Sequence, residues 1–92
     1  ECLKREKYES AIEVFKFLNN PDKLIEVGTE CIKHDHLVLG AKAFELANSP
    51  EKLNTIGDIF LHKEQLNNAY EVYKLAGNHT MIQFLRDNFN MS

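Results

Sequence analysis

The sequence contains nearly the same string twice, NNPDKL at residues 19–24 and NSPEKL at residues 48–53. The two strings stand 29 residues apart, and the agreement continues on both sides of them. Self-similarity at a fixed period of roughly 20–50 residues is the signature of a repeat architecture. This spacing limits the possible folds more than any other feature, and it predicts a chain of similar modules.

Three segments, residues 8–36, 37–65 and 66–89, align at this period without a gap. Apolar residues keep their columns through all three segments, as in Phe15, Phe44 and Tyr73; Leu24, Leu53 and Ile82; Val27, Ile56 and Leu85; and Cys31, Phe60 and Phe89. Chance does not preserve so many apolar columns together. We therefore interpret the chain as a repeat protein with three modules.

Each module predicts two helices. In the first module Leu24, Val27 and Cys31 stand at i, i+3 and i+7, which places them on one stripe of a helix. Residues that cap helix N-termini precede this stripe in every module, and proline follows the cap in the first two. The predicted turns have two residues each and would make the helices antiparallel: Asn19-Asn20, Asn48-Ser49 and Gly77-Asn78.

The predicted fold is all-α: one domain over residues 1–92 that forms an α-solenoid fragment of about three antiparallel hairpins, or six short helices. A single amphipathic hairpin cannot bury its apolar face alone, so neighbouring hairpins must cover it. Glycine inside a helix is costly, so Gly28, Gly40 and Gly57 require a packing reason. In the third module Arg86 stands in the column of Gly28 and Gly57, and Asn88, Asn90 and Ser92 make the tail more polar, which predicts the C-terminal end of a longer array.

The string AIEVFKFLNNPDKLIE at residues 11–26 resembles the helical zigzag of the clathrin heavy chain near its linker. The matching residues are Ala11, Val14, Phe15, Asn19, Pro21, Lys23, Leu24 and Ile25. The similarity extends over about residues 8–89, but the second module has Gly40 and Ala43 in place of the alanine and valine, and the third has no proline or lysine at its turn. It implies a clathrin-linker-like domain carried by another protein, with a role in vesicle coats or intracellular transport. Tetratricopeptide arrays have a similar architecture but a period of about 34.

The cluster Cys31, His34 and His36 contains residue types that bind zinc. Their columns favour another interpretation, because Cys31 aligns with Phe60 while the two histidines align with Lys63 and Gln65. We predict a core cysteine and two solvent-side histidines near a helix end, and no metal site. Cys31 and His34 could also form a nucleophile pair, but a thiol buried among apolar residues is inert.

No other pattern indicates catalysis. The sequence has no glycine-rich phosphate loop, serine-centred elbow or His-Glu-x-x-His motif. The carboxylates on the polar helix faces are predicted to be solvated surface groups: Glu13, Asp22, Glu26, Glu30, Glu45 and Glu51. We therefore expect no catalytic residue, no cofactor, no small-molecule substrate and no enzymatic activity.

The net charge of −3 disfavours a nucleic-acid surface, which usually needs a basic stripe. The basic segment Leu3–Lys7 is interpreted as a solvated helix start. We expect Tyr8, Tyr70 and Tyr73 to pack in the core, with a partner-binding role as the alternative. Two cysteines are too few for a disulfide framework, which favours a reducing, cytoplasmic compartment, and no apolar run has the ~18 residues of a membrane-spanning helix.

The sequence thus favours a non-catalytic scaffold for protein–protein interaction, with partner and partner-binding residues unassigned. Two alternatives remain open at this point: a helical accessory domain of a larger enzyme or regulator, and a nucleic-acid-binding helical array.

Overall fold

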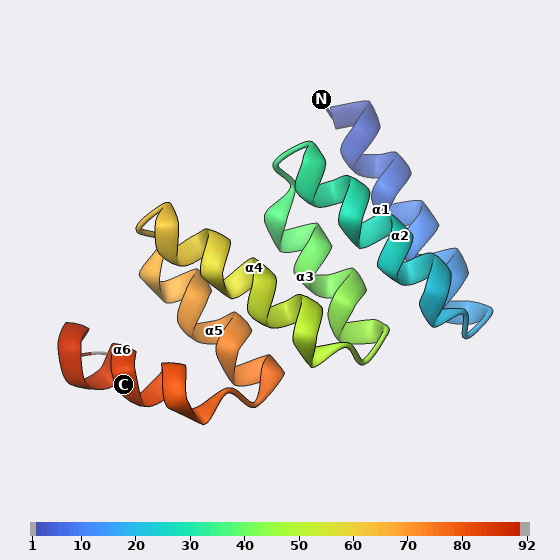
Figure 1. Ribbon diagram of the computed structural model, residues 1–92. Coiled ribbons are helices and arrows are strands. Elements are labelled where there is room, and N and C mark those ends of the chain that lie inside the picture. Colours follow the sequence, from blue (N-terminus) through green and yellow to red (C-terminus); the bar gives the residue numbers. More distant parts are fainter. Residues whose placement is uncertain (1, 91–92) are drawn as a thin grey trace. The chain divides into compact units, whose positions relative to one another are not determined.

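The computed structural model describes residues 2–90, and that range contains six α-helices and no strand (Figure 1). Their bounds are α1 (Cys2–Phe17), α2 (Pro21–Lys33), α3 (Leu37–Leu46), α4 (Pro50–His62), α5 (Leu66–Ala76) and α6 (His79–Phe89). The prediction of an all-α fold with six short helices is confirmed.

Helices α1–α3 form one compact unit and α4–α6 form another, divided between Ser49 and Pro50. In the first unit the most extensive pairing is α2 with α3, and α1 packs against both. In the second unit α4 pairs most extensively with α5, and α6 packs against α5. The strongest pairings therefore join the second helix of one predicted hairpin to the first helix of the next.

Helices α1, α3 and α5 end with the same backbone motif. Residues Asn19, Asn48 and Gly77 adopt left-handed φ angles of 54°, 58° and 71°. The N–H group of the following residue then donates to the carbonyl oxygen five residues earlier, as from Asn78 to Tyr73 at 3.0 Å. This is the Schellman motif, which satisfies the last carbonyl groups of a helix.

The links between helices differ slightly from the predicted two-residue turns. The third link is Gly77-Asn78 as predicted, but the first two contain one residue more, Leu18 and Ala47. In the first two links the helix ends two residues before the left-handed residue, at Phe17 and Leu46, whereas α5 ends one residue before Gly77. The Schellman motif also closes α2 and α4 through Asp35 and Glu64, whose φ angles are 64° and 61°.

The N-termini of α2 and α6 are capped as predicted. Asn20 Oδ1 accepts a hydrogen bond from the N–H group of Lys23 at 3.3 Å, and Asn78 Oδ1 accepts one from Met81 at 3.2 Å. Asn78 also donates from Nδ2 to Asn54 Oδ1 at 2.9 Å, which ties the start of α6 to α4. Ser49 stands directly before Pro50, and its capping role stays a prediction.

Gly28 and Gly57 each support an aromatic ring from the next helix. A Cβ atom built on Gly28 would lie 2.5 Å from Cε1 of Phe44, and one on Gly57 would lie 2.6 Å from Cε1 of Tyr73. Real carbon atoms do not approach so closely, so the ring position depends on the missing side chain. The packing reason expected for these glycines is therefore present, and it is a ring lying on the helix surface.

The core of the first unit is built around Ile12, Leu24, Cys31, Leu39 and Ala43, with Tyr8, Phe15 and Val27 packed at its edge. In the second unit the fully buried side chains include Ile56, Phe60, Tyr73 and Leu85. Cys31 is a core residue as its column predicted. Phe89, which shares that column, differs because its side chain is 47% exposed.

Asn78 provides a direct test of the α6 start. Asn78→Ala removes the cap, at a cost of about 1 kcal/mol, and the bond to Asn54, at about 1 kcal/mol more. Asn78→Ser keeps a capping oxygen and loses only the bond to Asn54. We expect the free energy of unfolding, measured by urea denaturation, to fall about twice as much for alanine as for serine. Equal losses would show that the cap contributes nothing.

Candidate functional site

The zinc-like cluster does not assemble around the cysteine. The side chain of Cys31 is fully buried, whereas that of His34 is exposed, with Nε2 3.9 Å from Oε1 of Glu30. Both histidine rings lie against the ring of Tyr8, with centroids 6.2 Å away for His34 and 5.6 Å for His36. Within residues 2–90, no three side chains of His, Cys, Asp or Glu gather as metal ligands would. His36 is half-buried, so its prediction as a solvent-side residue was wrong; it packs beside Tyr8.

The thiol of Cys31 is held in its protonated form. Burial raises its pKa to about 11, and the nearby carboxylate of Glu30 contributes in the same direction. Both effects disfavour the negatively charged thiolate, which is the reactive species. The side chain of the other cysteine, Cys2, lies outside the described residues.

The six carboxylates weighed as catalytic acids are all exposed, as predicted. Three of them form surface ion pairs: Glu13 with Lys42 at 3.6 Å, Glu26 with Lys23 at 3.5 Å and Glu30 with Lys33 at 3.4 Å. Such exposed pairs contribute little to stability. Exposed carboxylates of this kind are ordinary surface groups of a folded chain.

The tyrosines and the basic segment are largely as expected. Tyr70 is 5% exposed and Tyr73 is fully buried, which confirms their core positions, while Tyr8 is half-buried. Burial, with a hydrogen bond donated to Asp58, raises the pKa of Tyr73. In the basic segment, the side chains of Leu3 and Lys4 lie outside the described residues, and Arg5 pairs with Glu9 at 3.7 Å.

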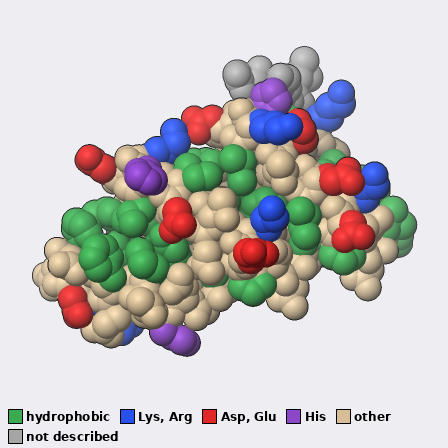
Figure 2. Space-filling view, in the orientation of Figure 1, with side chains coloured by type: hydrophobic (Ala, Val, Ile, Leu, Met, Phe, Trp, Pro, Cys, Tyr) green, Lys and Arg blue, Asp and Glu red, His purple; other side chains and the backbone are tan. Residues whose placement is uncertain are grey.

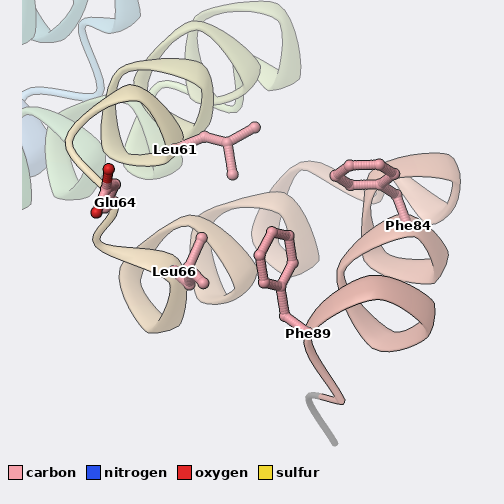
Figure 3. A pocket seen from close by; sticks show the side chains of 5 residues that line it. All are labelled: Leu61, Glu64, Leu66, Phe84 and Phe89. Atoms are coloured by element: carbon pink, nitrogen blue, oxygen red, sulfur yellow. The ribbon is translucent and has the colours of Figure 1, made fainter.

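The second unit contains an apolar hollow that the sequence did not reveal. We call it the α6 groove; it has a volume of about 430 Å³ and is lined by Leu61, Glu64, Leu66, Phe84 and Phe89. Figure 3 shows the four apolar side chains pointing toward one another across the hollow, with Glu64 on the turn between α4 and α5 at its edge. Figure 2 shows hydrophobic side chains gathered on this part of the surface.

The two phenylalanines of the α6 groove are only half-covered. Phe84 is 44% exposed and Phe89 is 47% exposed, and their rings meet edge to face with centroids 6.2 Å apart. Exposed contiguous apolar surface of this kind marks an interaction site in many proteins. One sequence signal was available for it: Phe84 stands where the two earlier modules have Thr55 and Glu26.

The chain was compared with protein-family models, with curated proteins and with solved structures, and none of them matches it. The resemblance to the clathrin heavy chain linker therefore stays a prediction. Within the described residues, no helix is both long enough and apolar enough to cross a membrane.

The state of Cys31 can be measured with a thiol reagent such as DTNB. In a Cys2→Ser background at pH 8, we expect Cys31 to react only after denaturant is added, because it is buried and its pKa is near 11. In the unfolded chain the pKa of the cysteine thiol is about 8.5, so the thiol should react promptly at the same pH. A folded protein that reacts at the rate of the unfolded chain would contradict this description of the site.

Proposed function

We propose that the chain is a non-catalytic α-solenoid scaffold that binds a helix of a partner protein in the α6 groove. The observation that carries this proposal is the groove itself, in which the side chains of Phe84 and Phe89 remain half-exposed. The scaffold is made from three copies of one hairpin, and the partner is a protein rather than a substrate.

The repeat is supported by features that recur 29 residues apart. The left-handed residues Asn19, Asn48 and Gly77 occupy one column of the alignment, and Asp35 and Glu64 occupy another. The rings that lie on Gly28 and Gly57 belong to Phe44 and Tyr73, which also stand 29 residues apart. Modules that share turns and packing in this way favour stacking in sequence order, which is how solenoids build their core.

A helix is the occupant that best fits the groove. Phe60, one period before Phe89, is 2% exposed, and its helix α4 is covered mainly by another helix, α5. Phe89 presents a comparable ring without such cover. Burying a phenylalanine completely is worth about 1.5–3 kcal/mol, so two half-exposed rings provide about that much driving force together. Glu64 at the edge favours a partner helix with a basic residue beside its apolar stripe.

The resemblance to the clathrin heavy chain linker supports a role in vesicle coats or intracellular transport. Such a role uses helical pairs as a frame on which other proteins assemble, in agreement with a groove that takes a helix. This cellular assignment rests on the resemblance at residues 11–26, while the binding mode rests on the α6 groove.

The groove can be tested with a double variant, Phe84→Ser/Phe89→Ser, and the matched control Phe17→Ser. Phe17 is 88% exposed and belongs to the other unit. We expect quantitative affinity capture to lose one set of proteins with the double variant and to keep it with the control. The leading protein is then purified, and calorimetry with the wild-type chain and both variants should reproduce the loss.

Circular dichroism spectra must show that both variants keep their helical content. A partner that binds the wild type and the double variant with equal affinity would overturn the assignment of the groove. Turnover of a small molecule by the purified chain would overturn the non-catalytic scaffold.

A further inference from the structure

A second cleft in the second unit has a different character, because it is lined by basic groups. Its volume is about 390 Å³, and its walls are Tyr70 and Lys74 from α5 with His79, Ile82 and Arg86 from α6. This volume lies in the range of small-molecule sites, roughly 300–1,000 Å³. No carboxylate is among these five residues, in a chain whose net charge is −3.

Two permanent positive charges are held around Tyr70. Arg86 donates from Nε to the hydroxyl oxygen of Tyr70 at 3.2 Å, and Nζ of Lys74 lies 5.5 Å from the centre of the Tyr70 ring. Tyr70 is itself 5% exposed, so it is a fixed support for both cations. The bond through Nε uses one of the five guanidinium donors of Arg86 and restrains its plane, which leaves the terminal N–H groups for a ligand.

The acidic groups nearest in sequence do not neutralise the cleft. Glu71 lies 3.9 Å from Lys74 in an exposed ion pair, which is a weak interaction in water. Asp87, beside Arg86, accepts a hydrogen bond from Gln83 at 2.9 Å. Neither carboxylate is among the residues that line the cleft, so the charged groups on its walls are all basic.

The hairpin does not need Lys74 and Arg86 in order to fold. One period earlier, Glu45 stands in the column of Lys74, and Gly57 stands in the column of Arg86. The second hairpin thus folds with the opposite charge at one position and with no side chain at the other. Only the third hairpin combines both cations with a histidine, so folding alone does not explain them.

We propose that this cleft binds a phosphate monoester. Such a group carries a charge of about −1.5 to −2 at neutral pH and three strong acceptor oxygens, which suit a lysine and an arginine together. A carboxylate carries a single charge and would leave one of the two cations uncompensated. The side chain of Ile82 gives the alkyl or aryl part of the ester an apolar wall. A phosphorylated protein side chain and a small phosphorylated metabolite both offer this chemistry.

The test is an NMR titration of the 92-residue chain at constant ionic strength. The probes are phenyl phosphate, blocked phosphoserine, glycerol 3-phosphate and acetate. We expect the phosphates to cause saturable shifts at Lys74, His79 and Arg86, and acetate to cause much weaker ones. Tighter binding of blocked phosphoserine would identify a protein side chain as the source of the phosphate, and tighter binding of glycerol 3-phosphate would identify a metabolite.

The decisive variant is Lys74→Gln, which leaves the bond between Arg86 and Tyr70 in place. A charge-assisted contact is worth at least about a tenfold change in the dissociation constant, so we expect phenyl phosphate to bind at least about tenfold more weakly. The matched control is Lys33→Gln, because Lys33 forms the same kind of i,i+3 pair with Glu30 at an exposed position. It should leave the dissociation constant unchanged.

Equal affinity in Lys74→Gln and wild type, equal shifts with acetate, or shifts that do not saturate would each overturn the proposal. A purely structural role for the basic groups would instead change only the melting temperature. The Phe84→Ser/Phe89→Ser protein should still bind phosphate, because those residues do not line this cleft. Loss of the α6 groove function and loss of the phosphate site are thereby distinguishable.

Discussion

The rest of the structure depends on an aromatic ring that lies on a glycine of the preceding helix. Phe44 covers Gly28 in the first unit, and Tyr73 covers Gly57 in the second. The absent Cβ lets a large flat side chain approach the helix backbone, and the contact joins α2 to α3 and α4 to α5, the most extensive helix pairings of each unit. Both rings are almost completely buried, so each contributes about 1.5–3 kcal/mol of burial free energy to its pairing.

The third hairpin lacks this ring-on-glycine contact. Both candidate sites, the α6 groove and the basic cleft, include residues of its helix α6. Arg86 occupies the column of the two glycines and donates a hydrogen bond to Tyr70, so α6 has no glycine at this position on which a ring could lie. The same helix presents Phe84 and Phe89 to the α6 groove and Arg86 to the basic cleft. A hairpin that keeps its turns and its buried Leu85 but alters its surface can acquire binding sites without losing its fold.

The sequence predicted the helices well because their signals are local. Apolar spacing, capping asparagines and helix-start prolines each act within one or two turns, and the structure places α2 and α6 directly after Asn20 and Asn78. The extra link residues Leu18 and Ala47 were missed because the last residue of a helix varies by one or two positions with the backbone geometry of its final turn. The α6 groove and the basic cleft were missed because each joins residues from two or three elements, and no local pattern at Leu61 or Ile82 indicates which distant side chain faces it.

The ring-on-glycine contact is tested most directly by a double-mutant cycle that combines Gly57→Ala with Tyr73→Leu. Alanine is favoured over glycine inside a helix by about 1 kcal/mol, so with leucine at position 73 the change at Gly57 should stabilise the protein or leave it unchanged. With the tyrosine ring in place, the added methyl group displaces the ring, and the same change should lower the free energy of unfolding. This reversal of sign is the predicted result. An effect of Gly57→Ala that is the same with tyrosine and with leucine would contradict the account.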